Sequence, residues 1–382
     1  MPATESSLRQ SPALFQRPTT PEAPVTFEVI GTTTAGDKPH SRADHLRDGI
    51  PPCVEIMTGA PFPLGEESER FDCCVPVEVV VTENKSSNRR YISVSKPAKR
   101  RQHRRSAGGD FTKGDVIVEA GECIQPHHIM ALASVGVREV PVLRRPRVAV
   151  FSTGSELLDG VKSHQFMISD ANGPYLTSML RKWGVDVDFR GVIVDHQGTM
   201  EEAVRSALDD EYDMIVTSGA VSAGRCDLIP GLIERIGGRT VFHKVAVKPG
   251  HPILFSMLPR ETGETAFFGL PGNPVAAAAC LRFFALRYLQ TLQLQRPEQP
   301  RVAVLRLSRE DTDSCNGTKR DLTFQKEPDI FRPAISQSGQ VWIIEDHSPG
   351  KTKPFLQADC WVHIPSGVSE LRAGSPVSIY PF

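Results

Sequence analysis

Short apolar runs alternate with amphipathic stretches through the middle of the chain. Apolar runs at 148–152, 187–194, 212–218 and 240–247 predict strands. Helical apolar spacing is present over residues 172–183, 200–208, 228–236 and 275–289. Strands that alternate with helices imply a parallel sheet with right-handed crossovers. We therefore predict a doubly wound α/β domain over residues 146–292.

The chain on either side of this domain has a different pattern. Residues 1–24 are polar and rich in proline, which predicts a disordered tail. Short β-like runs over 25–106 predict a small β-rich domain, and 107–145 contains a helix-like apolar stretch near 129–135. Residues 300–382 return to short β-like runs, which predict a C-terminal β-domain. The predicted fold class is therefore α/β plus β, with the α/β domain flanked by small, mainly-β domains.

Composition narrows the function classes. A length of 382 residues predicts two or three domains, and a net charge of −1 gives no field that would recruit nucleic acid or a membrane surface. The longest apolar candidate, 275–289, contains Arg282 and Arg287, so we expect no membrane span. Eight cysteines without a C-x-x-C pair or zinc spacing favour reduced thiols in the cytosol.

One cluster of charge stands out near the end of the first β-rich segment. It comprises Lys96, Lys99, Arg100, Arg101, Arg104 and Arg105. Such a cluster is typical of a nuclear signal or a patch that binds polyanions, and equally of a solvated loop.

The most conspicuous turn is Pro271-Gly272-Asn273-Pro274, which follows the apolar run Ala266–Leu270. Pro274 suits the first position of a helix, and the Asn273 side chain could cap that helix. Free amides at such a corner suit an anion, although an ordinary strand-to-helix corner has the same residues.

Polar and glycine residues gather in the loops that follow the predicted strands. Ligands of open α/β sheets bind beyond the carboxyl ends of the strands, so these loops are predicted to converge. Hydroxyls and glycine amides can hold phosphate, Lys248 can balance its charge, and acidic residues can hold a divalent cation. Each acid also has an ordinary role at a helix start or in a turn. The phosphate-binding candidates are Ser152, Thr153, Gly154, Ser218, Gly219, Ser222, Gly224, Pro249, Gly250, His251 and Pro271–Pro274, and the cation ligands are Glu156, Asp195 and Asp227.

Three common motifs are missing from the sequence. It has no G-x-G-x-x-G, which argues against a dinucleotide oxidoreductase, and no G-x-x-x-x-G-K-[ST], which argues against a P-loop NTPase. It has no G-x-S-x-G either, so a serine hydrolase is not supported.

Five motifs in order carry a specific resemblance. The motifs are Met57-Thr58-Gly59-Ala60-Pro61, Ser152-Thr153-Gly154-Ser155-Glu156-Leu157, Ser218 to Asp227, Lys248-Pro249-Gly250-His251-Pro252 and Leu270-Pro271-Gly272-Asn273-Pro274-Val275. With these motifs the chain resembles the molybdopterin molybdenumtransferase family, of the MoeA and gephyrin E-domain type, over residues 27–382, and its α/β domain is similar to MogA.

The resemblance implies a reaction and a set of partners. Molybdate is inserted into the dithiolene of adenylylated molybdopterin, and AMP is released with Mg²⁺ or another divalent cation. The family implies an elongated homodimer, with 107–145 as part of the dimerising linker, and contact with the adenylyltransferase of the same pathway.

The resemblance also assigns roles to residues of this chain. Arg105 and Asp110 match an R-x-x-G-x-D element that the family places near the dimer active site. Asp227, Lys248 and Asp110 are the implied catalytic residues, and Lys248 matches the first lysine of a K-P-G-K-P molybdate loop.

Several positions depart from the family pattern. An N-terminal S-x-M-D-G-Y-A motif is not found, and the second lysine of the molybdate loop is His251, whose ring is mostly neutral near pH 7. Ala220 replaces a glycine, Ala276 replaces a serine, and Arg332 is the candidate molybdate contact in the C-terminal domain.

Three functions follow as hypotheses. The first is an active molybdenum-cofactor enzyme. The second is a non-catalytic relative that binds molybdopterin nucleotides or acts as a scaffold. The third is a nucleotide-binding relative of the adenylyltransferase, against which the Met57–Pro61 motif and the C-terminal β region argue.

Overall fold

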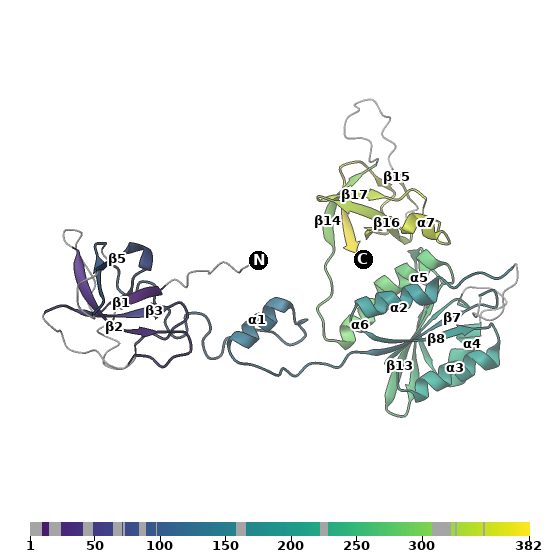
Figure 1. The fold of residues 1–382 in the computed structure, drawn as a ribbon. Helices are drawn as coiled ribbons and strands as arrows, with labels where there is room; N and C mark the ends of the chain where they lie inside the picture. Colours follow the sequence, from purple (N-terminus) through teal and green to yellow (C-terminus); the bar gives the residue numbers. More distant parts are fainter. Residues whose placement is uncertain are drawn as a thin grey trace. The chain divides into compact units, whose positions relative to one another are not determined.

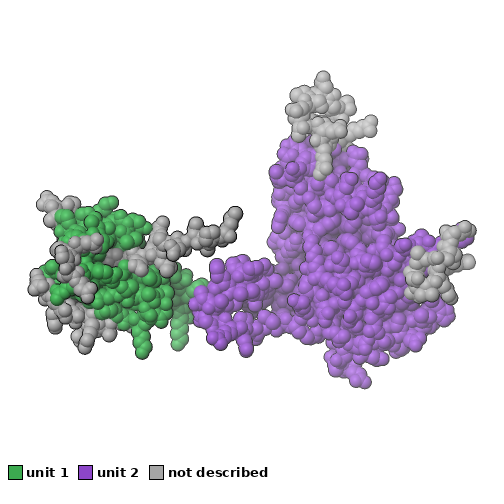
Figure 2. Space-filling model, in the orientation of Figure 1, with its two compact units in different colours: residues 1–116 green, residues 117–382 purple. Residues whose placement is uncertain are grey.

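The chain forms two compact units in a computed structural model, residues 1–116 and residues 117–382 (Figure 2). The structure describes residues 10–14, 24–40, 49–63, 71, 73–83, 89–96, 98–157, 166–221, 228–307, 322–324, 327–346 and 348–382.

The first unit is a six-stranded sheet with the strand order β4-β1-β3-β2-β6-β5. Its core is formed by Phe27, Cys53, Cys73, Ile92 and Val94, and strands β3 and β6 are buried along most of their length. The strands are β1 (Gln10–Leu14), β2 (Val25–Thr33), β3 (Pro52–Met57), β4 (Cys73–Cys74), β5 (Val80–Glu83) and β6 (Tyr91–Val94), with a 3₁₀ turn at Val77–Val79.

The prediction of a disordered tail over residues 1–24 is wrong for Gln10–Leu14. This segment forms β1, which pairs antiparallel with both β3 and β4. Its partners begin at Pro52 and Cys73, about 40 and about 60 residues later in the chain. A local composition rule does not detect pairing at that sequence distance, which is why the strand was missed.

The second unit contains a six-stranded sheet with the order β10-β12-β13-β9-β7-β8. Strands β13, β9, β7 and β8 are mutually parallel, as predicted, whereas β12 pairs antiparallel with both β13 and β10. The sheet is therefore mixed. Its strands are β7 (Arg147–Thr153), β8 (Asp186–Ile193), β9 (Met214–Ser218), β10 (Arg239–His243), β12 (Leu254–Arg260) and β13 (Gly263–Leu270).

Helices cover both faces of this sheet (Figure 1). On one face, α2 and the long α5–α6 helix pack on Val148, Met214 and Phe268. On the other face, α3 and α4 pack on Phe151 and Ile215. The helices are α2 (Asn172–Lys182), α3 (Gln197–Asp209), α4 (Leu228–Ile236), α5 (Pro274–Cys280) and α6 (Leu286–Leu292), with a π-helical turn at Leu281–Ala285.

The strand predicted over 240–247 is interrupted. Strand β10 ends at His243, and Val247–Lys248 forms a separate strand, β11, which pairs parallel with β16 of the C-terminal sheet. Because β10 and β12 are antiparallel neighbours, the loop between them is a hairpin connection and not a crossover. The hairpin still lies at the edge where the parallel strands end, since Leu254 pairs with Gly269 near the end of β13.

The C-terminal region is the predicted β-domain. Its sheet has the order β11-β16-β17-β14-β20-β18, and a pairing between β16 and β18 closes it into a barrel-like arrangement. The elements are β14 (Arg301–Arg306), β15 (Leu322–Thr323), β16 (Asp329–Gln337), β17 (Gln340–Ile343), α7 (Thr352–Phe355), β18 (Cys360–Ile364), β19 (Glu370–Leu371) and β20 (Pro376–Pro381).

The α5–α6 helix joins the α/β sheet to the C-terminal domain. Phe283 stacks on Phe331 at 3.8 Å between ring centroids, and the buried Arg282 pairs with Glu298 at 2.6 Å. Among the described residues, Pro274–Leu292 is the one helical stretch long and apolar enough to cross a membrane, and 61% of its most apolar window is buried in the protein. This burial and the contacts of Arg282 and Phe283 are typical of a helix in the core of a protein.

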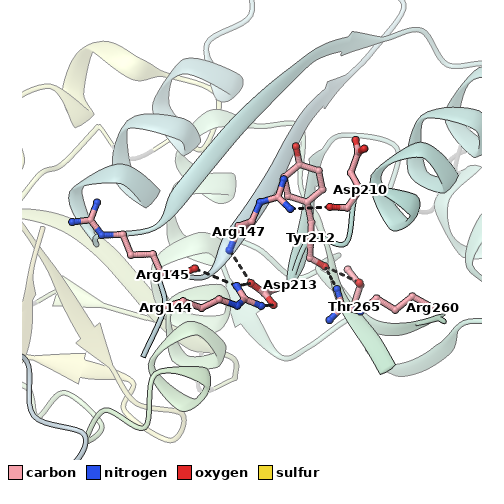
Figure 3. Close-up of polar contacts among 8 residues, drawn as sticks. All are labelled: Arg144, Arg145, Arg147, Asp210, Tyr212, Asp213, Arg260 and Thr265. Atoms are coloured by element: carbon pink, nitrogen blue, oxygen red, sulfur yellow. Dashed lines mark hydrogen bonds and ion pairs between the residues drawn. The ribbon is translucent and has the colours of Figure 1, made fainter. Parts of the chain in front are cut away.

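A polar network holds the linker where it enters the α/β sheet (Figure 3). The Arg144 guanidinium donates to both carboxylate oxygens of Asp213, each at 2.7 Å, and the Arg147 backbone N–H donates to Asp213 at 2.8 Å. The Arg147 side chain lies over the Tyr212 ring at 4.7 Å. Upstream of this linker, helix α1 (Pro126–Ser134) has no buried residue.

Candidate functional site

The carboxyl ends of β7 and β9 meet in register. Ser152 lies opposite Ser218, and the Thr153 hydroxyl donates to the Ser218 carbonyl at 2.9 Å. Gly219 follows with φ of +101°, and a Cβ at this position would lie 2.5 Å from the Thr153 carbonyl oxygen. Only glycine fits such an approach, so the ends of β7 and β9 are held close together at this position.

Buried hydroxyls at these strand ends have no hydrogen-bond partner within the described part of the chain. They belong to Ser152, Thr217 and Ser218, all of which are fully or nearly fully buried. A buried hydroxyl without a partner costs free energy, on the order of 1–3 kcal/mol, and so indicates a group that a ligand or ordered water satisfies.

The Pro271–Pro274 corner lies beside Gly219. The Gly219 N–H donates to the Leu270 carbonyl at 2.8 Å, and a Cβ on Gly272 would lie 3.7 Å from the Gly219 Cα. Asn273 occupies the N-cap position of α5 with Pro274 inside the first turn, as predicted. The predicted cap by the Asn273 side chain is wrong, because that side chain makes no cap hydrogen bond.

The corner offers fewer free amides than the sequence implied. Pro274 has no N–H, and the Val275 N–H donates to the Pro349 carbonyl at 2.9 Å. Packing of α5 against the C-terminal domain therefore occupies the first amide of the helix.

The loop between β10 and β12 carries the residues that match the molybdate loop. Gly250, with φ of +115°, packs on α5, where a Cβ would lie 2.5 Å from the Cys280 sulfur. Burial raises the pKa of the Cys280 thiol, so it stays neutral and donates to the Gly250 carbonyl at 3.5 Å. His251 Nδ1 lies 2.7 Å from the Val245 carbonyl, so Nδ1 carries the hydrogen and Nε2 accepts when the ring is neutral.

Two cations lie on neighbouring strands where this loop meets the C-terminal sheet. Lys248 is exposed and lies opposite Ile330 in the β11–β16 pairing, two residues before Arg332 on β16. Burial lowers the pKa of Arg332 to about 10, which leaves the guanidinium charged at neutral pH. No ion pair with a carboxylate is found for Lys248 or Arg332 among the described residues, and burial is the one cause of the Arg332 pKa shift.

The predicted cation ligands are brought together in part. Asp195 and the Ser155 turn exchange two hydrogen bonds of 3.2 Å, and Asp195 Oδ1 is buried without a partner in the described structure. The Glu156 carboxylate folds back over Gly154. The described residues contain no group of three acidic, histidine or cysteine side chains that could hold a metal. Asp227 lies outside the described residues, as do Ser222 and Gly224.

Arg105 and Asp110 lie in the first unit. They face each other at 3.9 Å, and both are largely exposed. The basic cluster around them is part of a hydrogen-bonded turn, in which the Cys74 N–H donates to the Gln102 carbonyl at 2.9 Å and Arg104 lies over the Phe62 ring.

The structure adds two residues that the sequence analysis did not select. The Asn172 side chain donates to the Gly272 carbonyl at 2.8 Å. Asp170 accepts from the backbone N–H groups of Asn172 and Gly173 at 2.9 and 3.0 Å. An Asp ahead of a helix start is a recognisable capping signal, whereas the contact to Gly272 spans 100 residues and has no local signal.

Two family models match this chain. Residues 23–136 match the MoeA N-terminal region (domain I and II), and residues 149–291 match a probable molybdopterin binding domain. The second match covers all the strand-end loops described above. The fold and the site thus define a protein of the molybdopterin-binding class.

Individual relatives extend the match over most of the chain. A molybdopterin molybdenumtransferase of Haemophilus influenzae is 30% identical over 86% of this chain and 77% of its own length, and one of Synechococcus elongatus is 29% identical over 94% and 82%. A crystal structure of the molybdopterin biosynthesis MoeA protein of Pyrococcus horikoshii matches with a TM-score of 0.71 at 25% identity, over 95% of this chain and 83% of that one. The chain belongs to the molybdopterin molybdenumtransferase family, as its sequence motifs indicated, and is a transferase of molybdenum cofactor biosynthesis.

Proposed function

We propose that this transferase inserts molybdate into the dithiolene of adenylylated molybdopterin and that AMP is released. The observation that carries the proposal is the convergence of three strand-end loops around buried hydroxyls that lack partners. Ser152 and Ser218 provide those hydroxyls, and Gly219 provides an approachable backbone. A phosphorylated pterin has the hydrogen-bonding groups that such a site requires.

Molybdate is a dianion and needs cations close to the reacting sulfurs. Lys248 and Arg332 are the two cations that the β11–β16 pairing brings to one place. The desolvation of Arg332 strengthens its attraction for an anion, since charges interact more strongly away from bulk water. We assign molybdate binding to this pair, with the Gly250 backbone beside it.

A divalent cation would be held by Glu156 and Asp195, with Asp227 as the third ligand and Asp110 as a further catalytic acid. The orphaned Asp195 Oδ1 fits this role, because hard cations prefer carboxylate oxygens. A bound Mg²⁺ would supply charge neutralisation at the phosphoanhydride. The chain's own contribution is to hold these carboxylates next to the phosphate-binding loops, through the hydrogen bonds between Asp195 and Ser155.

The active form is proposed to be a cytosolic homodimer, and Arg105 is proposed to take part in substrate binding. Helix α1 and the linker after it expose large apolar side chains, of which Met130 is 72% and Val142 69% exposed. Monomeric surfaces rarely leave such residues together in water, which supports an interface here. Contact with the pathway's adenylyltransferase would deliver the adenylylated substrate.

A second candidate is a relative that binds molybdopterin nucleotides without turnover. His251 favours it, since the ring donates to the Val245 carbonyl and replaces the second lysine of the loop with a group that accepts at Nε2 when neutral.

One experiment separates the two candidates. Purified protein is mixed with adenylylated molybdopterin, molybdate and Mg²⁺, and AMP release is measured by chromatography alongside activation of a molybdenum-free apoenzyme. AMP release with activation supports the transferase, and binding by calorimetry without release supports the second candidate. The absence of binding would contradict both. Lys248→Ala is expected to reduce activation, while Lys244→Gln, in the same loop, serves as the matched control.

A further inference from the structure

Asn172 connects two elements that are far apart in the sequence. It is the first residue of α2, and its side-chain amide donates to the Gly272 carbonyl in the Pro271–Pro274 corner at 2.8 Å. Among the described residues, this is the hydrogen bond that joins α2 to the Gly272 carbonyl.

Asn172 is itself held firmly. The Asp170 carboxylate accepts the backbone N–H groups of Asn172 and Gly173 through one oxygen, Oδ1. A charged acceptor at a helix start stabilises that turn. The Asn172 amide therefore projects from a fixed backbone.

The corner that Asn172 contacts is otherwise held just before and just after Gly272. Toward the sheet, the Gly219 N–H donates to the Leu270 carbonyl at 2.8 Å, just before the corner. Toward the C-terminal domain, the Val275 N–H donates to the Pro349 carbonyl at 2.9 Å, just after it. Gly272 is between these two anchors and is exposed, so its peptide group depends on the Asn172 amide for its orientation.

We propose that Asn172 is a positioning residue that fixes the Gly272 peptide, and through it the wall of the substrate crevice beside Gly219. The proposal rests on the proposed function for the identity of the ligand, but the fixing of the corner is a property of the ligand-free chain. Loss of a single neutral hydrogen bond that orients a site lowers affinity about 3- to 10-fold.

The test uses Asn172→Asp and Asn172→Ala. The first keeps the shape but replaces the donor with a carboxylate that faces the Gly272 carbonyl, and the second removes the group. Gln197→Glu is the matched control, because Gln197 is the first residue of α3 and also gains a carboxylate at a helix start. Amide hydrogen exchange over residues 268–280 is measured without ligand, and the Kd for adenylylated molybdopterin is measured by calorimetry.

Both Asn172 variants are expected to speed exchange over 268–280 and to raise Kd about 3- to 10-fold with an unchanged melting temperature. Gln197→Glu is expected to change neither. Unchanged hydrogen exchange over residues 268–280 in Asn172→Asp would overturn the proposal. A rise in Kd of equal size in all three variants, the Gln197→Glu control included, would overturn it as well. If the unmodified protein does not bind the ligand, the proposed function fails, and the exchange rates still decide whether Asn172 fixes the corner.

Discussion

The backbone at Gly219 illustrates how single residues shape the site. Its positive φ and its approach to Thr153 place a bare peptide between the ends of β7 and β9, next to hydroxyls without partners. A side chain there would collide with the Thr153 backbone and hydroxyl, which lie 2.5 and 2.6 Å from the position of a Cβ. The residue type therefore determines whether the ends of β7 and β9 can approach this closely.

Gly219→Ala is expected to destabilise the protein by about 2–4 kcal/mol, from overpacking against Thr153 together with an unfavourable φ, and to abolish ligand binding. Gly184→Ala is the control, because Gly184 also has a positive φ, of +75°, but a Cβ there meets no atom within 4 Å. Gly184→Ala should lower the free energy of unfolding by about 1 kcal/mol and leave ligand binding unchanged. Urea unfolding and calorimetry measure both quantities, and equal losses in the two variants would contradict the steric argument.

His251 gives a second prediction at this scale. His251→Lys is expected to raise molybdate affinity about 3- to 10-fold, because a permanent cation replaces a ring whose Nδ1–H is committed to the Val245 carbonyl. His251→Asn keeps a donor near the Nδ1 position and adds no charge, so it should leave affinity unchanged. Equilibrium dialysis with molybdate at two ionic strengths measures the effect, and a gain that persists undiminished at high salt would contradict an electrostatic cause.

At the scale of elements, the hydrophobic pattern predicted most helices and the parallel strands. Helix α4 has the predicted limits, and α2 ends one residue earlier than expected. Strand β12 was missed because Ser256 and Pro259 interrupt its apolar alternation, and Ser256 is nevertheless fully buried through the sheet contacts of its neighbours. The pairing of Val247–Lys248 with β16 depends on a strand about eighty residues later, which no local pattern reveals.

The linker clamp gives a prediction at this scale. Burial works to raise the pKa of the Asp213 carboxyl, but the Arg144 guanidinium and the Arg147 N–H outweigh it and hold the pKa below its usual value. A carboxyl whose pKa is depressed by folding stabilises the protein above its unfolded pKa of about 3.9. That stabilisation is lost as pH falls through the lower, folded pKa.

Asp213→Asn is expected to lower the free energy of unfolding at pH 7 by about 1–3 kcal/mol, with a smaller difference from the unmodified protein at pH 3. Proteolysis of the linker over residues 137–146 should also become faster, since Arg144 loses its partner. Arg205→Ala, which breaks the exposed Glu201–Arg205 pair on α3, is the control and should change stability by less than about 0.5 kcal/mol. A stability difference that grows toward pH 3 would contradict the assigned sign.

At the scale of the whole molecule, the site depends on two domains of the second unit. Lys248 and Arg332 are 84 positions apart and come from the α/β hairpin and the C-terminal sheet, which β11 joins. The α5–α6 helix fixes their separation, because it packs on the α/β sheet and also on Phe331 and Trp361. The proposed anion site therefore requires both domains to be folded and docked.

Dimer formation through α1 is the prediction for the assembly. A double change, Ile129→Glu with Met130→Glu, is expected to give a monomer, because it adds two charges to an exposed apolar helix without disturbing a buried residue. Val302→Glu, at an equally exposed apolar position on β14, is the control and should leave the assembly unchanged. Sedimentation velocity measures the mass, and a monomeric unmodified protein would contradict the proposed homodimer.

The sequence by itself determined the family, the α/β class of the central domain and the strand-end loops that carry the chemistry. These depend on local apolar periodicity, glycine and proline positions and short motifs, all of which are encoded within a few residues. Only the tertiary structure decided the pairing of β1, the hairpin at β12, the β11–β16 connection and the contact from Asn172 to Gly272. Each of these joins segments whose pairing depends on packing and hydrogen bonding with distant partners, which local motifs do not encode.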